Sequence, residues 1–139
     1  MLRVVIDANV WVSALLNPGN ARTIQELFEA GRFHLFAATE IMTEYSNVFS
    51  RTTFSARINP ERKELLLNLI QEAARVVQLT GSLPQISRDP KDDIFLECAG
   101  VADCDYLVTG DKDLLVLQNY GRTTIVTPTQ FLQILTTSQ

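Results

Sequence analysis

The sequence predicts an α/β fold, a three-layer α/β/α sandwich in which a mostly parallel sheet of about five strands lies between helices. Short apolar, β-branched runs alternate along the chain with segments whose apolar residues recur at helical spacing. Such alternation indicates βαβ units and therefore a parallel sheet that is covered on both faces. The chain has 139 residues, of which 46% are hydrophobic, so we expect one domain spanning residues 1–139 around one core.

The first half of the chain is predicted to hold two strands and three helices. The expected strands are short apolar runs, and each expected helix carries apolar residues three or four positions apart. A turn-forming sequence at residues 17–20 ends the first helix, and a glycine ends the second. In chain order, we expect a strand at Leu2–Ile6, a helix from about Asn9 to Leu16, a helix containing Ile24, Leu27 and Phe28 that ends at Gly31, a strand at Phe33–Ala37, and a helix from an N-cap at Thr39 through Phe49.

The second half is predicted to hold three strands and four helical segments. Asn59 followed by Pro60 is a good helix start, because asparagine caps a helix and proline fits its first position. In chain order, we expect a helix from that start, a strand at Arg75–Leu79, a loop at Thr80–Lys91, a helix from about Asp92 to Ala102 that buries Ile94, Phe95, Cys98, Val101 and Ala102, a strand at Tyr106–Thr109, a helical turn at Asp111–Leu117, a strand at Thr123–Val126, and a last helix that starts at Thr127-Pro128.

Composition excludes several classes of protein. No apolar run reaches the roughly 18–20 residues that a membrane span needs. The first residues show neither a basic segment nor a small-residue cleavage site, so we expect a cytoplasmic protein. Two cysteines make neither a disulfide framework nor a zinc quartet, and one histidine excludes a metal site built from several histidines.

The charge balance is informative because the chain is acidic overall. Twelve lysines and arginines against sixteen acidic residues give a formal net charge of −4, so contact with a polyanion must be local. Eight of the acidic residues fall within one quarter of the chain, and this clustering has to be explained. They are Asp89, Asp92, Asp93, Glu97, Asp103, Asp105, Asp111 and Asp113.

Carboxylates follow two of the predicted strands. Asp7 comes directly after the first strand, and Asp111 comes two residues after the fourth. Ligands of parallel α/β sheets bind outside the carboxyl ends of the strands, so both side chains are expected at one edge. Asp92 and Asp93 open the helix before the fourth strand, and that helix is expected to begin at the same edge.

The helix after the second strand offers a further carboxylate. At about 100° per residue, Glu44 lies at the border of the apolar face centred on Tyr45, whereas Glu40 points further into solvent. Four carboxylates at one edge repel each other, and a divalent cation would relieve that repulsion. Oxygen-only ligands favour Mg²⁺ or Mn²⁺, and one or two such ions suit in-line displacement at phosphorus.

Three segments resemble the PIN domain, and more narrowly the VapC-like toxin components of bacterial and archaeal toxin–antitoxin pairs. They are residues 5–9, 89–99 and 106–114, which occur in the family's order and extend the likeness over essentially the whole chain. The resemblance implies a metal-dependent endoribonuclease. Its acidic quartet, which would hold the metal and carry out catalysis, falls on Asp7, Glu44, Asp92 and Asp111.

The resemblance also assigns supporting residues. Asn9 matches a small polar residue two positions after the first aspartate, Thr109 matches the hydroxyl residue near the last acid, and Asp113 matches an accessory acid. Asp92 is preferred to Asp93 as the third ligand because the residues three and seven positions later then fit the family spacing. Asp93 remains the alternative.

The resemblance implies an RNA substrate, a cognate antitoxin and a homodimer. These three expectations rest on family analogy. The dimer would use exposed apolar residues of the first or central helices. RNA is a polyanion, so basic residues near the acidic edge are expected to line a substrate groove. The candidates are Arg51, Arg57, Arg88 and Lys91.

Three other functions remain open at this point. One is a catalytically degenerate PIN fold that binds RNA or protein. Another is an aspartate-based phosphohydrolase, which expects a second aspartate where Asn9 stands. The third is a receiver-like signalling domain, which expects a phosphate-accepting aspartate after the third strand, where Leu79, Thr80 and Gly81 offer none.

Overall fold

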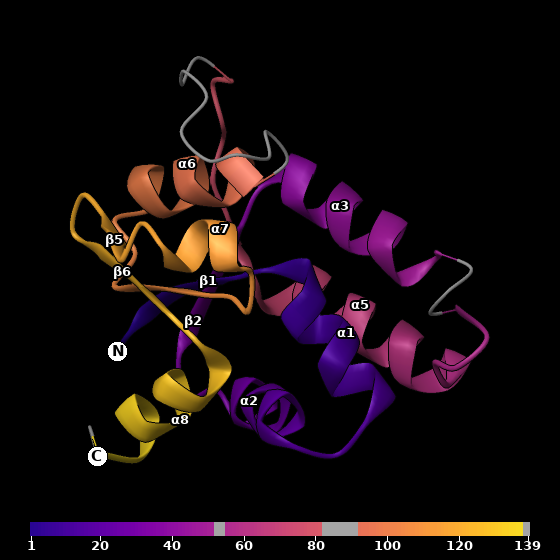
Figure 1. Ribbon diagram of the computed structural model, residues 1–139. Helices are drawn as coiled ribbons and strands as arrows, with labels where there is room; N and C mark the ends of the chain where they lie inside the picture. The colour runs from indigo at the N-terminus through magenta and orange to yellow at the C-terminus, as the bar shows by residue number, and fades with distance from the viewer. Residues whose placement is uncertain (52–54, 82–91, 138–139) are drawn as a thin grey trace.

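The computed structural model describes residues 1–51, 55–81 and 92–137, which form a twisted sheet with helices on both faces (Figure 1). Within these residues the sheet has six strands in the order β3-β2-β1-β4-β6-β5, and only the β5–β6 pair is antiparallel. The strands are β1 (Arg3–Ile6), β2 (His34–Ala37), β3 (Arg75–Val76), β4 (Tyr106–Val108), β5 (Asn119–Tyr120) and β6 (Thr123–Val126).

Strand β1 lies at the centre of the sheet, between β2 and β4. Its residues Val4, Val5 and Ile6 are fully buried, as expected for a parallel strand that is covered on both faces. Ile6 is in register with Val108, so β1 and β4 end at the same level. This shared end places the residues that follow the two strands side by side.

The helices form the outer layers. Helix α6 packs against β1, β2 and β4 on one face, while α2 and α8 pack together on the other, so the predicted three-layer architecture is confirmed (Figure 1). Seven described helices carry labels: α1 (Ala8–Leu16), α2 (Asn20–Glu29), α3 (Thr39–Phe49), α5 (Pro60–Ala73), α6 (Asp93–Val101), α7 (Lys112–Leu115) and α8 (Pro128–Thr137).

Several sequence predictions of local structure need correction. The sheet has a sixth strand, β5, because a tight turn at Gly121, with φ of 58°, folds Asn119–Tyr120 back onto β6. Strand β3 is shorter than predicted and ends at Val76. Ala38, whose side chain makes no capping hydrogen bond, occupies the N-cap position of α3, and Thr39 is the first residue of the helix.

Helix α6 buries a different face from the one predicted, because Leu96, Glu97 and Ala99 are also buried. Phe95, Cys98 and Ala102 are buried as expected, but Val101 is 49% exposed and Ile94 is only partly buried. At about 100° per residue, Val101 and Ile94 lie roughly a quarter-turn or more away from the face that meets the sheet. The predicted loop at residues 80–91 lies mostly outside the described residues.

Aromatic side chains pack between the helices that surround the carboxyl end of β1. The ring of Tyr45 in α3 meets Trp11 of α1 edge-on, with ring centroids 6.4 Å apart, and meets Phe95 of α6 at the same centroid distance. All three rings are almost wholly buried. Helices α1, α3 and α6 are therefore fixed relative to one another near the ends of β1 and β4. No helix in the described part of the chain is long and apolar enough to cross a membrane.

Candidate active site at the carboxyl edge of the sheet

Asp7 stands where β1 ends and α1 begins. Its side chain caps α1, since Oδ1 accepts a hydrogen bond from the backbone N–H of Asn9 at 3.3 Å. Its Oδ2 accepts a hydrogen bond from the hydroxyl of Thr109 at 2.7 Å. The side chain is only 4% exposed, so these two bonds fix a carboxylate inside the protein just beyond the central strand.

Thr109 connects the ends of the two neighbouring strands. Its buried hydroxyl donates to Asp7 and also accepts a hydrogen bond from the backbone N–H of Asp111 at 3.0 Å. Asp111 in turn caps the short helix α7, because its Oδ1 accepts from the backbone N–H of Asp113 at 2.8 Å. One chain of hydrogen bonds thus positions Asp7 and Asp111 at the same edge.

The charges at this edge act on Asp7. Burial raises the pKa of the Asp7 carboxyl above its usual value, while the hydrogen bonds from Thr109 and from the Asn9 backbone oppose that rise. The negative charges of Asp111 and Glu44 raise the pKa further. Asp111 and Glu44 therefore each lie near enough for their charge to act on Asp7.

Glu44 reaches this edge from α3. It is partly buried, whereas Glu40, one turn earlier, is exposed, as the helical spacing predicts. The next residue, Tyr45, is fully buried and its hydroxyl donates a hydrogen bond to the carbonyl of Ile6. Burial raises the pKa of Tyr45, so the hydroxyl keeps its proton. Helix α3 is therefore attached to the residue that directly precedes Asp7.

The sequence pattern predicts only that Tyr45 belongs to an apolar face, so this role of its hydroxyl was missed. A tyrosine on a buried face is itself the signal, because a buried hydroxyl needs a hydrogen-bond partner. Only the structure shows that the partner is the Ile6 carbonyl at the end of β1.

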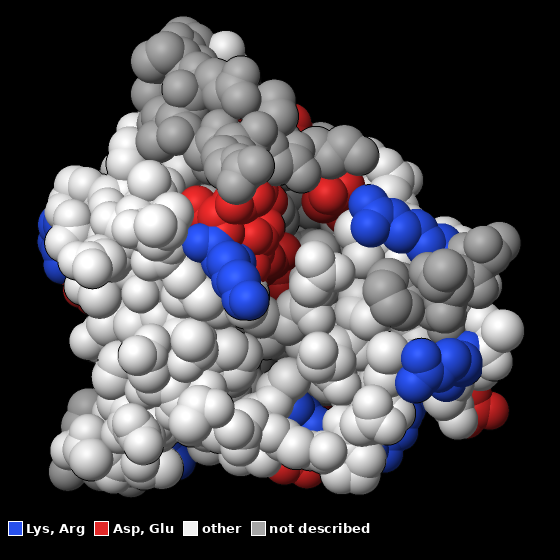
Figure 2. All heavy atoms as spheres, in the orientation of Figure 1, with Lys and Arg blue, Asp and Glu red and all other residues white. Residues whose placement is uncertain are grey.

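Asp92 and Asp93 stand at the beginning of α6. Asp92 directly precedes the helix and is 8% exposed, while Asp93 is its first residue and is partly exposed. Helix α6 contacts both β1 and α3, the elements that position Asp7 and Glu44. Figure 2 shows acidic side chains gathered in a hollow between α6, α7 and α3, in the orientation of Figure 1.

The remaining predicted residues divide into three groups. Asp113 is partly exposed in α7, and Asn9 is exposed in the first turn of α1. Arg51 and Arg57 are exposed beyond the end of α3, and Arg51 is about two helical turns past Glu44. Arg88 and Lys91 lie outside the described residues.

The chemistry of the donor set fits a hard divalent cation. Both cysteines are buried, and burial raises the pKa of Cys98 and Cys104 to about 12, so neither offers a thiolate. His34 begins β2 and therefore lies at the opposite, amino edge of the sheet. Carboxylate oxygens remain, and a cation beside Asp7 would offset both the burial and the neighbouring negative charges that raise its pKa.

The described side chains form no ready-made cage for an ion. Among them, no three acidic, cysteine or histidine side chains stand close enough to hold a metal as they are placed. Mg²⁺ commonly keeps several waters and takes only one or two carboxylates from the protein. Asp7 with Asp111 or Glu44 matches that requirement.

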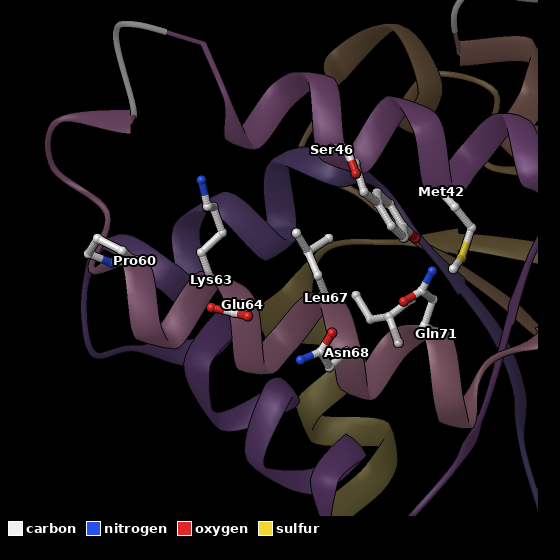
Figure 3. A pocket seen from close by; sticks show the side chains of 10 residues that line it. Met42, Ser46, Pro60, Lys63, Glu64, Leu67, Asn68 and Gln71 are labelled. Atoms are coloured by element: carbon white, nitrogen blue, oxygen red, sulfur yellow. The ribbon is translucent and has the colours of Figure 1, made fainter.

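A second cleft lies away from these carboxylates, between α3 and α5. Figure 3 shows Met42 of α3 projecting toward Gln71 of α5 across this cleft, which Ser46 and Leu67 also line. Its volume is about 500 Å³, and Tyr45 contributes to its lining. Asp7, Glu44 and Asp111 do not line it.

Fold and site together define an α/β protein with an acidic pocket at the carboxyl edge of a parallel sheet. The sequence agrees with a known family of this class: residues 3–113 match the family model of the PIN domain. The chain therefore belongs to the PIN domain family, whose members are generally nucleases.

Two relatives extend the comparison. The chain is 25% identical over 122 residues to the protein MJ1680 of Methanocaldococcus jannaschii, which covers 87% of this chain and 78% of that protein. The crystal structure of PAE2754 from Pyrobaculum aerophilum superposes with a TM-score of 0.63 at 16% identity, over 98% of this chain and 90% of that one. The second likeness supports the PIN-like fold.

Proposed function

We propose that the protein is an endoribonuclease that hydrolyses RNA phosphodiester bonds with the help of Mg²⁺ or Mn²⁺. The observation that carries the proposal is the buried Asp7 carboxylate, which two hydrogen bonds hold beside the charges of Asp111 and Glu44. Membership of a family of nucleases supports it. A buried carboxylate beside other negative charges has a stability cost, and cation binding is the simplest function that offsets it.

The chain's own residues would divide the work as follows. Asp7 and Asp111, with Glu44 and Asp92, would hold the ion, which supplies Lewis-acid activation of water and neutralises charge on the phosphate. The Thr109 hydroxyl keeps the Asp7 carboxylate in one orientation, and it fixes Asp111 by accepting a hydrogen bond from that residue's backbone N–H. Asn9 contributes its backbone N–H to Asp7 and an exposed amide toward solvent. Asp93 remains the alternative to Asp92 as a ligand, and Asp113 would be an accessory acid.

Substitution of individual carboxylates tests the proposal. We expect Asp7→Asn and Glu44→Gln to lower Mn²⁺-dependent cleavage of single-stranded RNA at least about a hundredfold, because each removes a charge that acts on the metal and phosphate. Glu40→Gln is the matched control, since Glu40 is exposed one turn away on the same helix. The products are expected to carry 5′-phosphate and 3′-hydroxyl ends.

Two results would contradict the mechanism. One is full cleavage by purified Asp7→Asn with an intact fold; the other is wild-type cleavage that persists in excess chelator. Tight RNA binding without any cleavage by the wild type would favour the alternative, a degenerate PIN fold that only binds. An aspartyl-phosphate trapped by rapid quench would instead revive the phosphohydrolase, against which Asn9 argues.

We further propose that the protein is the toxin of a type II toxin–antitoxin pair and acts as a homodimer. This finer role rests on the resemblance of three motifs to VapC-like toxins. Expression of the wild type alone should arrest growth of a bacterial host, and Asp7→Asn should not. Normal growth at confirmed expression of active nuclease would overturn the toxin role, and a monomer by light scattering would overturn the dimer.

A further inference from the structure

A second hollow adjoins the acidic pocket where α1, the turn after β4 and the start of α8 come together. Its volume is about 270 Å³. Asp111 belongs both to this hollow and to the group of carboxylates around Asp7, so a molecule seated here lies beside the candidate active site. The lining consists of Asn9, Val10, Ser13, Gly110, Asp111 and Pro128.

We propose that this hollow is a nucleotide subsite that receives the base next to the scissile phosphate and prefers adenine. The inference rests on the proposed ribonuclease function and adds a substrate preference to it. None of the four candidate catalytic carboxylates except Asp111 takes part in its lining.

The polar groups of the hollow suit the edge of a base. Asn9 and Ser13 are four residues apart on α1, so their side chains share one face at a separation of about 6 Å along the helix. Both are exposed, and together they offer an amide and a hydroxyl. An asparagine amide pairs bidentately with the donor–acceptor edge of adenine, and single-stranded RNA presents such edges unpaired.

The apolar groups suit the face of the same base. Val10 is buried against the core, and Pro128 is the first residue of α8 and only partly exposed. Pro128, the more exposed of the two, would contact a planar ring beside the small part of Val10 that lines the hollow, and removal of apolar ring surface from water is favourable. The volume lies just below the roughly 300–1,000 Å³ of pockets for drug-sized ligands, so the hollow fits one nucleotide rather than an oligonucleotide.

Gly110 keeps one wall of the hollow open. A Cβ built on Gly110 would meet no heavy atom within 4 Å, and its backbone is not in the left-handed region. An alanine at this position would therefore project a methyl group into unoccupied space without a clash inside the protein. Because Gly110 lines the hollow, we expect Gly110→Ala to narrow the subsite while the fold is preserved.

Nucleotide titration tests the subsite without any cleavage. The four nucleoside 5′-monophosphates and ribose 5-phosphate are each titrated in Mg²⁺ buffer, and amide chemical shifts are followed by NMR. We expect AMP to shift the amides of Asn9, Ser13 and Gly110 and to bind about fivefold or more tightly than ribose 5-phosphate. Gly110→Ala and Ser13→Ala should remove about fivefold or more of the AMP affinity and leave ribose 5-phosphate unchanged.

Ser46→Ala supplies the matched control. Ser46 is also an exposed helical serine, but it lines the cleft between α3 and α5. Equal affinity for all five compounds would mean that the base contributes nothing to binding, and this would overturn the base subsite. Unchanged AMP affinity in Gly110→Ala would overturn it as well, as would shifts confined to residues outside the lining.

Mapping of cut sites on random-sequence RNA separates this inference from the proposed function. Wild type should favour adenine beside the cut, and Gly110→Ala should lose that preference by about fivefold or more. Cleavage with no base preference in the wild type overturns the subsite but leaves the ribonuclease. Selective AMP binding without any RNA cleavage would support the subsite and overturn the ribonuclease function.

Discussion

The carboxyl edge around β1 and β4 differs sharply from the region around α5. At the edge, buried side chains are held by defined bonds, as in the contacts of Asp7 with Thr109 and of Tyr45 with Ile6. Helix α5 spans fourteen residues but buries only Leu66 and Ile70, and hollows lie on both of its sides, against α3 and against α2. The comparison indicates that side chains are packed most tightly around the carboxylates at the edge. Helix α5 is packed less tightly against the rest of the protein.

The largest expected effect contrasts one buried and one exposed apolar residue. Phe95 is 2% exposed beneath the acidic edge, so Phe95→Ala should lower the free energy of unfolding by about 3–5 kcal/mol. Leu65 in α5 is 69% exposed, and Leu65→Ala should change it by no more than about 0.5 kcal/mol. Urea denaturation followed by circular dichroism measures both. Equal losses would mean that α5 is as well packed as the edge.

A smaller effect is expected at the contact between α3 and β1. Tyr45→Phe removes the hydroxyl that donates to the Ile6 carbonyl and leaves that buried acceptor without this donor. We expect the free energy of unfolding to fall by about 1–3 kcal/mol and RNA cleavage to fall with it, because Ile6 directly precedes Asp7. Ser46→Ala, the next residue on α3 but exposed, should change neither quantity. Unaltered stability in Tyr45→Phe would show that the edge depends less on this bond than on ring packing.

The smallest effect depends on pH. Because the folded pKa of Asp7 is raised above its usual value of 3.8, the folded protein retains a proton that the unfolded chain has already lost. Stability conferred by Asp7 therefore falls as the pH rises from near 4 through the raised pKa, and stays lower above it. Asp7→Asn does not titrate, so its free energy of unfolding relative to wild type should increase over this window.

The size of that increase is about 1.4 kcal/mol for each unit by which the folded and unfolded pKa values differ. Thermal unfolding from pH 3 to pH 8 in the presence of a chelator measures it. Glu40→Gln should follow the wild-type pH profile. A stability difference between Asp7→Asn and wild type that is the same at every pH would contradict the raised pKa.

Much of the fold followed from the sequence because the strands of a parallel sheet are continuous apolar runs. The helix start at Asn59 was also predictable and is confirmed, since its side chain accepts hydrogen bonds from the backbone N–H groups of Glu61 and Arg62. Strand β5 was not, because Asn119 and Tyr120 form a strand only through pairing with β6 after the turn at Gly121. Pairing partners are a tertiary property that a two-residue segment does not encode locally.

The site, like the fold, could be predicted from the sequence only in part. The positions of Asp7 and Asp111 followed from the rule that parallel strands end at one edge, and the structure connects them through Thr109. The catalytic role of each residue remains a prediction. The hollow beside Gly110 had no sequence signal, because α1, the turn after β4 and α8 approach one another only when the chain is folded.

The hydroxyl of Thr109 both donates and accepts a hydrogen bond, and this limits the residue types that can occupy position 109. It is fully buried, gives its single hydrogen to Asp7 and receives one from the backbone of Asp111. Valine has the same shape but can serve neither neighbour, and a longer polar side chain has no room in a closed interior. Serine is the only natural replacement that keeps both contacts, so this position should vary between two residues across descendants that retain the site.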